Sequence, residues 1–315
     1  MSNQVTHSRG RILVSPRSFT KDPPPALDRL KDEGYETLLT PAGRMPTQEE
    51  LFRLLPGCIG YIAGVEPIGG DLLRAATGLR AISRNGTGID NIDLKAAEER
   101  GIAVLRASGA NARGVAELTW GLVISLARSI PASDAALKAP GWERHLGLEL
   151  ENRQLGVVGC GTIGRMVAQF GDAFGMHVTA YDPYPDETFS PGSTFSYGPL
   201  ESVISTSDVI CLHCPPPHGE PLITRARIES MKPGALLVNT ARADLVDDSA
   251  IVNALDAGKL GGYAADVFQT EPPGDDPLAR HPKVIATPHV GAFTRESTDR
   301  VVEMTINQLL SALQK

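Results

Sequence analysis

The sequence contains no apolar run long enough to cross a membrane, because a transmembrane helix needs roughly 18 or more such residues. The nearest candidate, residues 118–130, is interrupted by Thr119, Ser125 and Arg128. The first ten residues are polar and lack the apolar core of a signal peptide. A membrane-spanning or exported protein is therefore not expected.

Basic residues and cysteines are also scarce. The chain has 30 Lys and Arg against 37 Asp and Glu, whereas nucleic-acid binding needs a basic surface. Four cysteines in 315 residues are too few for a disulfide framework. Cys211 and Cys214 form a CxxC pair, but Cys58 and Cys160 do not supply the second ligand pair of a zinc site. We therefore expect no nucleic-acid partner, no bound metal, reduced thiols and a cytoplasmic location.

The length predicts two domains, because 315 residues exceed what one hydrophobic core usually holds. After a loose tail at residues 1–10, apolar segments alternate with helical ones up to residue 105, a pattern typical of a small parallel sheet. The expected strands are residues 11–14, 35–39, 57–63, 79–83 and 102–105, and the expected helices are residues 26–34, 71–76 and 95–101.

A second alternating unit starts at Gln154 and predicts six strands with helical crossovers, which is the doubly wound pattern. Before it, a helix over 112–129, ended by Pro131, is apolar on more than one side and should be buried against the other domain or another subunit. An amphipathic helix over 295–313 should return to the first domain. The six strands are residues 155–158, 177–181, 209–213, 235–240, 262–265 and 284–286.

Gly159, Gly161 and Gly164 form a GxGxxG motif, which alone is weak evidence because glycine is common in this chain. The motif follows a predicted strand and opens a predicted helix over 163–174. In dinucleotide-binding folds the first glycine permits a tight turn, the second admits a pyrophosphate, and the third lets helix and strand pack closely. The helix N-terminus then offers free N–H groups to the phosphates. The alternative is a glycine-rich turn without a nucleotide.

An acid is expected about 20 residues after the motif, at the end of the next strand. Asp182 stands there. Its carboxylate can bind a ribose 2′-hydroxyl and repel a 2′-phosphate, and Pro183, Tyr184 and Pro185 offer no arginine for such a phosphate. We therefore predict NAD rather than NADP as the cofactor.

Three predicted strands of the second unit lead to residues that could take part in a reaction: Arg242, Glu271 and His289. The ends of parallel strands gather in one crevice. Hydride transfer at a carbon bearing oxygen also moves a proton, which a histidine oriented by a carboxylate can carry near neutral pH. Arg242 could bind a carboxylate with its planar fork. Taken singly, these residues could instead be a surface arginine, a loop acid and an unremarkable histidine.

In the first domain, Arg84, Asn85 and Gly86 begin a turn of small residues after the strand at 79–83. The backbone N–H groups of such a turn could form an anion nest for a substrate carboxylate. A plain strand-to-helix turn is the alternative.

Taken in order, these motifs resemble the D-isomer-specific 2-hydroxyacid dehydrogenase family, and within it the phosphoglycerate dehydrogenases. The matching segments are residues 84–93, 116–119, 159–164, 181–183, 239–242, 266–268 with 271–272, and 287–292. The resemblance implies an α/β fold of two doubly wound parallel-sheet (Rossmann-like) domains, with the cofactor domain inserted in the substrate domain. We expect a flavodoxin-like substrate-binding domain at 1–106 and 290–315, and an NAD-binding Rossmann domain at 107–289.

The resemblance also implies an activity: NAD-dependent interconversion of a D-2-hydroxy acid and its 2-keto acid by hydride transfer. It implies His289 as the acid/base, Glu271 as its partner and Arg242 as the substrate-orienting residue, in a homodimer built on the cofactor domains. Besides the three glycines, the implied cofactor contacts are Thr87, Thr162, Ile163, Asp182, Cys214, Thr240, Ala241, Asp266 and Gly291, with Asp266 near the nicotinamide carboxamide.

The chain departs from the family pattern in two places. Ala243 and Asp244 follow Arg242 where the family usually has two glycines, so this turn is bulkier. Ala63 stands where phosphoglycerate enzymes place a phosphate-binding arginine, and Arg17 is the remaining basic candidate. The substrate is therefore open. Two alternatives to a hydroxyacid dehydrogenase are the same fold acting on a formate- or phosphite-type donor, and a non-catalytic NAD-sensing protein.

Overall fold

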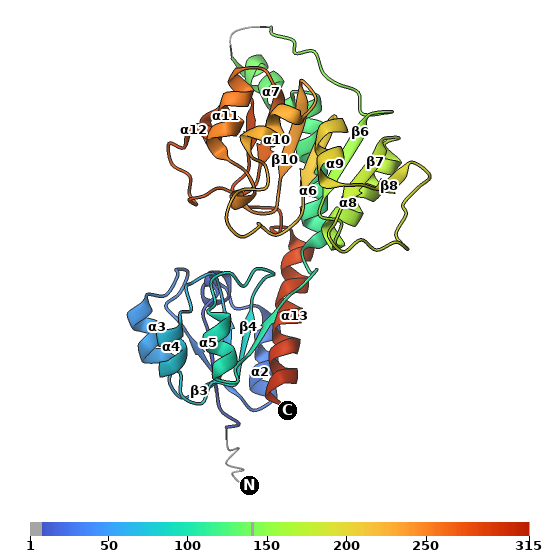
Figure 1. The fold of residues 1–315 in the computed structure, drawn as a ribbon. Coiled ribbons are helices and arrows are strands. Elements are labelled where there is room, and N and C mark those ends of the chain that lie inside the picture. Colours follow the sequence, from blue (N-terminus) through green and yellow to red (C-terminus); the bar gives the residue numbers. More distant parts are fainter. Residues whose placement is uncertain (1–7, 140–141, 315) are drawn as a thin grey trace. The chain divides into compact units, whose positions relative to one another are not determined.

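The structure is a computed structural model that describes residues 8–139 and 142–314. The chain forms two compact units, one from Met1–Asn111 with Arg295–Lys315 and the other from Ala112–Thr294. The second unit is thus inserted into the first (Figure 1). Residues 1–7 of the predicted tail lie outside the described residues.

A five-stranded parallel sheet forms the centre of the first unit, in the order β2-β1-β3-β4-β5. This is the strand order of flavodoxin-like folds, in which the chain changes direction across the sheet between β1 and β3. The strands are β1 (Arg11–Val14), β2 (Glu36–Leu39), β3 (Cys58–Ala63), β4 (Ala81–Arg84) and β5 (Ala103–Arg106).

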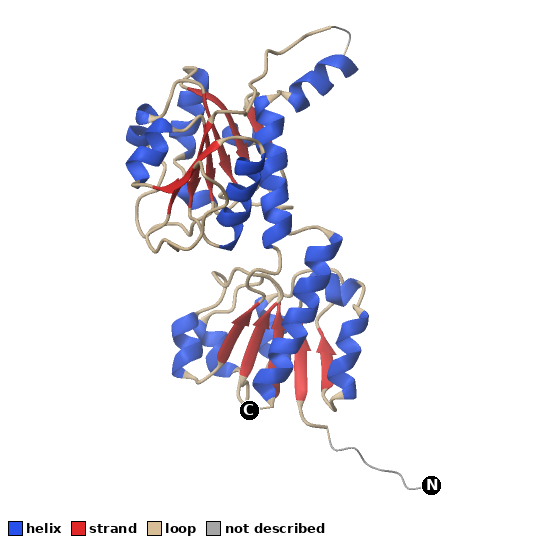
Figure 2. Ribbon diagram, turned by 90° about the vertical axis from the view of Figure 1, so that its right-hand side faces the viewer, coloured by secondary structure: helices blue, strands red, loops and turns tan. Residues whose placement is uncertain are grey.

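Helices cover both faces of this sheet (Figures 1 and 2). One face packs against α3 (Gln48–Leu54), α4 (Gly70–Ala75) and α5 (Leu94–Glu99). The other packs against α1, α2 and the terminal helix α13, whose Ile306 and Leu309 are fully buried. The predicted return of the last helix to the first unit is confirmed. The bounds on this side are α1 (Arg17–Lys21), the 3-10 helix η1 (Pro25–Leu27), α2 (Asp28–Asp32) and α13 (Arg295–Leu313).

The second unit contains a seven-stranded parallel sheet in the order β12-β11-β10-β9-β6-β7-β8. Its strand order is that of a Rossmann fold, and the switch point lies between β6 and β9. The strands are β6 (Gln154–Val158), β7 (His177–Tyr181), β8 (Phe195–Tyr197), β9 (Val209–Leu212), β10 (Ala235–Asn239), β11 (Leu260–Ala265) and β12 (Val284–Ala286).

Two layers of helices enclose this sheet, α6 and α8 on one face and α9 to α12 on the other. The helices are α6 (Ala112–Ala127), α7 (Ile130–Lys138), α8 (Thr162–Ala173), α9 (Leu200–Thr206), α10 (Arg225–Ser230), η2 (Ala243–Leu245), α11 (Asp248–Asp256) and α12 (Pro277–Arg280). The predicted α/β class with two doubly wound sheets is confirmed. None of the helices within residues 8–139 and 142–314 has the length and apolar character of a transmembrane helix.

The sequence interpretation missed several short elements. Helix α3 begins with a capping box, in which Thr47 accepts the Glu50 N–H (3.2 Å) and Glu50 accepts the Thr47 N–H (2.9 Å). Its Thr-x-x-Glu signature was readable in the sequence. Strand β8 has three residues and lies at the sheet edge beside β7, so it is too short for an alternating pattern to be recognised.

The predicted end of the long helix at Pro131 is wrong. Helix α6 already ends at Ala127, and Ser129 adopts a left-handed conformation with φ of 49°. Pro131 then lies in the first turn of α7, where the missing proline N–H costs no helical hydrogen bond. The predicted helix over 26–34 likewise consists of η1 followed by α2.

The carboxyl edge of the first sheet encloses a buried glutamate. Glu66 is 1% exposed, and its Oε1 accepts hydrogen bonds from the Tyr61 hydroxyl (2.5 Å), the Gly64 N–H (2.9 Å) and the Ser15 hydroxyl. Burial and the neighbouring Glu66 raise the pKa of Tyr61, so its hydroxyl keeps the proton that it donates. The carboxylate therefore joins the end of β1 to the loop after β3.

Replacing Glu66 by alanine should lower the free energy of unfolding by about 3 kcal/mol, because each buried donor left without an acceptor costs roughly 1–3 kcal/mol. Urea denaturation followed by circular dichroism measures this loss. Glu98→Ala, the same change at an exposed position of α5, should barely shift the midpoint. A loss smaller than about 1 kcal/mol in Glu66→Ala would contradict the role given to this carboxylate.

Candidate active site

The turns that follow β10, β11 and β12 lie next to one another, because these strands are neighbours in a parallel sheet. Arg242 follows β10, Glu271 follows β11, and His289 follows β12. The N–H of Asp266, directly after β11, also donates to the carbonyl of Asn239 at the end of β10 (3.0 Å). The three predicted residues are therefore carried along one edge of the second sheet.

The carboxylate of Asp266 holds the loop that follows β12. Asp266 is 2% exposed, and its Oδ1 accepts the Thr287 hydroxyl (2.6 Å) and the Val290 N–H (2.8 Å). Its Oδ2 accepts the Gly291 N–H (2.8 Å). The structure thus places two predicted cofactor ligands, Asp266 and Gly291, in the buried support of the loop that carries His289.

His289 is hydrogen-bonded to Glu271 on that support. Its Nδ1 lies 2.8 Å from Glu271 Oε2 and 3.1 Å from Oε1, and Oε1 also accepts the Phe268 N–H (3.3 Å). The His289 backbone has a φ of 52°, a left-handed conformation uncommon outside glycine and frequent at functional sites. Because an ionised carboxylate only accepts hydrogen bonds, Nδ1 carries a proton and Nε2 is the atom available for proton exchange. The two side chains are 53% and 39% exposed, so a ligand can reach them.

The turn that carries Arg242 is folded around a buried asparagine. Asn239 is fully buried, its Oδ1 accepts the Ala241 N–H (3.1 Å), and its Nδ2 donates to the Arg242 carbonyl (2.8 Å). The Arg242 side chain is half-buried, and its Nη1 donates to the Ala241 carbonyl (2.7 Å). The base of the arginine is therefore held at the end of β10, with Ala243 and Asp244 accommodated in the short helix η2.

The three motif glycines meet three different steric requirements. Gly159 has a φ of 92°, and a Cβ there would lie 2.6 Å from the Cys214 nitrogen. A Cβ on Gly164 would lie 2.0 Å from the Gly159 carbonyl oxygen, so this position needs glycine for packing. A Cβ on Gly161, the N-terminal cap of α8, would meet no atom within 4 Å. The open space beside Gly161 at a helix N-terminus fits a phosphate group of a dinucleotide.

Asp182 lies at the end of β7 beside this glycine loop. Its Oδ2 accepts the Cys160 N–H (2.8 Å), and its Oδ1 accepts the Tyr184 N–H (2.9 Å). The loop and the turn after β7 are thereby joined through one carboxylate. This position matches that of the acid that binds the ribose in dinucleotide-binding folds.

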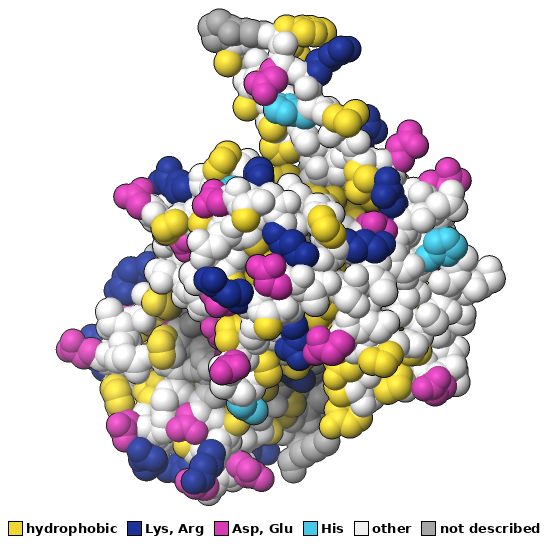
Figure 3. Space-filling view, turned by 45° about the horizontal axis from the view of Figure 1, so that its top comes forward, with side chains coloured by type: hydrophobic (Ala, Val, Ile, Leu, Met, Phe, Trp, Pro, Cys, Tyr) yellow, Lys and Arg dark blue, Asp and Glu magenta, His cyan; other side chains and the backbone are white. Residues whose placement is uncertain are grey.

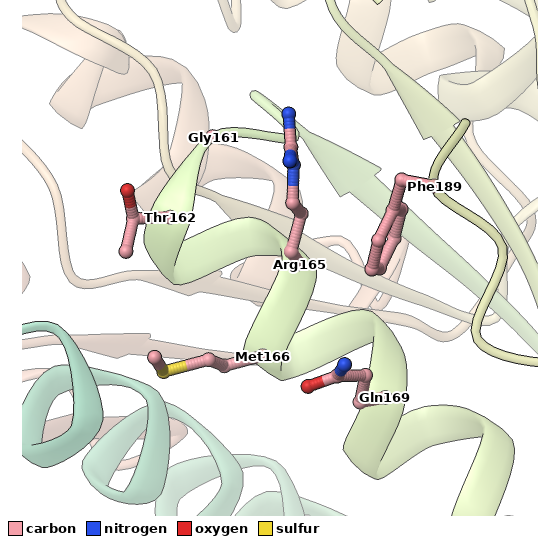
Figure 4. Close-up of a pocket in the computed structure, with 6 residues that line it drawn as sticks. All are labelled: Gly161, Thr162, Arg165, Met166, Gln169 and Phe189. Atoms are coloured by element: carbon pink, nitrogen blue, oxygen red, sulfur yellow. The ribbon is translucent and has the colours of Figure 1, made fainter. Parts of the chain in front are cut away.

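An arginine that the sequence interpretation overlooked lies beside the same loop. Arg165, from the first turn of α8, donates from Nε to the Cys160 carbonyl (3.1 Å) and forms an ion pair from Nη1 with Asp186 (2.8 Å). Figure 4 shows its side chain next to the ring of Phe189, above the helix. Arg165 directly follows Gly164 in the sequence and precedes Asp182, so the residues after Asp182 do not reveal it.

The remaining predicted contacts of the second unit differ in exposure. Thr162 is exposed, while Ile163 and Ala241 are half-buried. The Thr240 hydroxyl lies 2.8 Å from that of Thr119 on α6, so its side chain already has a partner. Cys214 is half-buried, and burial raises the pKa of its thiol to about 11, so the thiol stays protonated.

His213 is a further polar residue near the switch point. The backbone N–H of His213 donates to the Val158 carbonyl (2.7 Å), which fixes the end of β9 against β6. Both ring nitrogens are buried and have no hydrogen-bond partner within the part of the chain that the structure describes. Burial lowers the pKa of His213 to about 3, so its ring is neutral. Among residues 8–139 and 142–314, no three His, Cys, Asp or Glu side chains are grouped as metal ligands.

The predicted substrate and cofactor residues of the first domain, Arg84, Asn85, Gly86 and Thr87, lie at the end of β4 in the first unit. The Asn85 N–H donates to the Ala63 carbonyl (2.8 Å), and the Gly86 N–H donates to the Arg84 carbonyl (2.8 Å). In this structure both N–H groups are thus bonded to backbone carbonyls. Substrate binding by this turn stays a prediction.

Residues 120–291 match the family model described as D-isomer specific 2-hydroxyacid dehydrogenase, NAD binding domain. The chain is 40% identical over 265 residues to the D-3-phosphoglycerate dehydrogenase of Sus scrofa, an alignment that covers 82% of this chain and 49% of that protein. The chain thus spans about half the length of the curated relatives it matches.

Two solved structures are similar over nearly the whole chain. A glyoxylate reductase from Paecilomyes thermophila has a TM-score of 0.87 and 26% identity, covering 97% of this chain and 96% of that one. A D-lactate dehydrogenase from Aquifex aeolicus, solved with NAD and lactic acid, has a TM-score of 0.82 and 27% identity, covering 96% and 95%. With the family model, these similarities lead to one conclusion: this chain belongs to the D-isomer specific 2-hydroxyacid dehydrogenase family, and its second unit contains the NAD-binding domain of that family.

Proposed function

We propose that this protein is an NAD-dependent oxidoreductase that interconverts a D-2-hydroxy acid and its 2-keto acid. The observation that carries the proposal is the His289–Glu271 pair on a loop anchored by Asp266, within an NAD-binding domain. The names of the relatives, a D-3-phosphoglycerate dehydrogenase and a D-lactate dehydrogenase, support the same reaction class.

In this proposal each residue has a separate role. NAD, when bound, supplies or accepts the hydride. Arg242 binds the substrate carboxylate with its planar guanidinium. His289 donates a proton from Nε2 to the oxygen on C2 during reduction and takes it back during oxidation. Glu271 accepts the hydrogen bond from Nδ1 and so holds the orientation of the imidazole ring.

The cofactor would be held by the edge of the sheet around β6 and β7. The pyrophosphate would lie against Gly161 and the N-terminus of α8, and the ribose hydroxyls would bind Asp182. We assign the other predicted cofactor contacts of the second unit to NAD as well. Asp266 and Gly291 act through the loop that they hold, and the remaining contacts are Thr162, Ile163, Cys214, Thr240 and Ala241. Asp182 is the reason to propose NAD rather than NADP.

We propose that the substrate carries its carboxylate as its single strongly anionic group. Ala63, at the position expected to carry a phosphate-binding arginine, is fully buried, and the buried carboxylate of Glu66 lies in the loop that follows it. Arg17 is exposed at the start of α1 and is the remaining basic candidate for binding a substrate phosphate in the first unit.

The test is a panel of 2-keto acids, with and without a second anionic group, assayed for NADH oxidation. Sustained turnover of at least one member is expected, with simple 2-keto acids preferred over one that bears a phosphate on C3. A preference for the phosphorylated acid would contradict the substrate proposal but leave the reaction class intact. Activity on formate or phosphite alone, or NADH binding without turnover of any donor or acceptor, would overturn the reaction class.

His289→Ala should lower kcat by about 10²–10⁴-fold, the usual contribution of a general acid, while the Kd for NADH changes little. Stopped-flow or steady-state NADH oxidation and fluorescence titration measure the two quantities. His218→Ala, at an exposed loop position, is the matched control and should retain full activity. Near-normal turnover by His289→Ala would remove this histidine from the mechanism.

We also propose a homodimer formed by the second unit, in the cytoplasm, where the four free cysteines would stay reduced. Helix α7 and the segment after it expose large apolar side chains, and none of the α7 residues is buried within this chain. Hydrophobic side chains are visible along the projecting part at the top of Figure 3. Such an apolar surface is typical of a protein interface. The exposed residues are Ile130 (48%), Leu137 (66%), Trp142 (79%) and Leu146 (101%).

Light scattering after size exclusion should give twice the chain mass of 33.5 kDa. The double variant Leu137→Glu with Trp142→Glu should be monomeric, because two charges would have to be buried in the interface. Leu94→Glu, at a 46% exposed position on α5 of the first unit, is the control and should remain dimeric. A monomeric unaltered protein, or a dimeric double variant, would contradict the proposed interface.

A further inference from the structure

The ion pair between Arg165 and Asp186 lies near Asp182, the acid to which we assign the adenosine ribose of the cofactor. The 2′ position of that ribose carries a hydroxyl in NAD and a phosphate in NADP. Arg165 emerges from the first turn of α8, and its guanidinium carbon lies 5.4 Å from the centre of the Phe189 ring. Arg165 and Phe189 line a cavity of about 460 Å³ along the start of α8 (Figure 4). The other lining residues are Gly161, Thr162, Met166 and Gln169. The basic group is therefore next to the surface that the cofactor is expected to occupy.

Cys160 connects this arginine to the ribose-binding acid. The Cys160 N–H donates to Asp182 Oδ2 (2.8 Å), and the Cys160 carbonyl accepts from Arg165 Nε (3.1 Å). The backbone N–H of Cys160 therefore holds the Asp182 carboxylate, and its backbone carbonyl holds the Arg165 guanidinium. An arginine in such a neighbourhood is the group that binds the 2′-phosphate in NADP-dependent dinucleotide folds.

Asp186 is positioned to keep this arginine from a phosphate. Its Oδ1 accepts the Thr188 N–H (3.0 Å) and the Thr188 hydroxyl (2.6 Å), which leaves Oδ2 to bind Arg165 Nη1 (2.8 Å). The hydrogen bonds from Thr188, followed by the nearby Arg165, lower the pKa of Asp186, so it is ionised at neutral pH. A pair with side chains 38% and 33% exposed adds little to stability, and its position beside the cofactor surface suggests another role.

We propose that Asp186 is a specificity-determining residue that acts with Asp182 to exclude NADP, by neutralising Arg165 and adding a negative charge where the 2′-phosphate would bind. The proposal rests on the NAD-binding role given to the second unit and deepens it. A neutral 2′-hydroxyl would meet no penalty from the pair, whereas a phosphate would face two carboxylates and an arginine that is already bound. Loss of the Asp186 charge should release Arg165 toward the phosphate.

The test compares the affinities of NADH and NADPH by isothermal titration calorimetry, which requires no turnover. Asp186→Asn should tighten NADPH binding by roughly tenfold, the value of about one charge-assisted hydrogen bond, and should change NADH binding much less. Glu187→Gln is the matched control, because it removes the same charge from the adjacent, exposed residue. This control should leave the ratio of the two affinities within about twofold of that of the unaltered protein.

A second variant separates the arginine from the general loss of negative charge. Asp186→Asn combined with Arg165→Met should lose the gain in NADPH affinity, because the released guanidinium is what binds the phosphate. An unchanged NADPH affinity in Asp186→Asn, an equal gain in Glu187→Gln, or a gain that persists without Arg165 would each overturn the proposal. Loss of NADH binding in Asp186→Asn would also overturn it, since Asp186 would then serve to hold the loop.

Failure of this proposal and failure of the proposed reaction give different results. A protein that binds NADH but reduces no 2-keto acid would overturn the dehydrogenase proposal, and the affinity ratios would still test the role of Asp186. An unaltered protein that binds neither NADH nor NADPH would overturn both.

Discussion

The geometry of the candidate active site depends on the buried carboxylate of Asp266. It accepts two backbone N–H groups and one hydroxyl from the loop after β12, and its own N–H is bonded to the end of β10. Without this acceptor, three donors would be left unpaired in a buried position, which is costly. These hydrogen bonds hold the loop in which His289 has its left-handed backbone and its contact with Glu271. Asp266 thus positions the acid–base pair through hydrogen bonds to Thr287, Val290 and Gly291, the neighbours of His289 in the loop.

In the first sheet, too, a buried carboxylate accepts several hydrogen bonds at the carboxyl ends of the strands. Glu66 accepts donors from the end of β1 and from the loop after β3, as Asp266 does for β11 and β12 in the second sheet. The carboxyl ends of parallel strands collect backbone N–H groups that the sheet no longer pairs, and a buried acid satisfies several of them at once. In the second unit this rigid support carries exposed chemical groups, His289 and Glu271. The candidate catalytic residues of this fold therefore lie on loops that buried hydrogen bonds hold in one conformation.

The sequence predicted what depends on local pattern. The buried strands are short apolar runs. The GxGxxG spacing predicted a separate steric requirement for each glycine, and the structure shows these requirements at Gly159, Gly161 and Gly164. The Arg165–Asp186 pair was not predicted, because it joins a helix to a loop beyond the next strand and has no local signature. The hydrogen bonds of Asn85 and Gly86 were missed for the same reason, since a turn that could form an anion nest can also bond to the neighbouring strand. Residue types thus indicated the chemistry, while tertiary contacts decided which groups remain available for it.

We propose hydride transfer between NAD and C2 of a D-2-hydroxy acid as the reaction of this protein. The most direct measurement is the reduction of an accepted 2-keto acid with NADH that carries two deuterium atoms at C4 of the nicotinamide. Mass spectrometry and chiral chromatography of the product then locate the label and assign the configuration. One deuterium at C2 of a D-configured hydroxy acid is expected. A product without deuterium at C2, or one of L configuration, would contradict it.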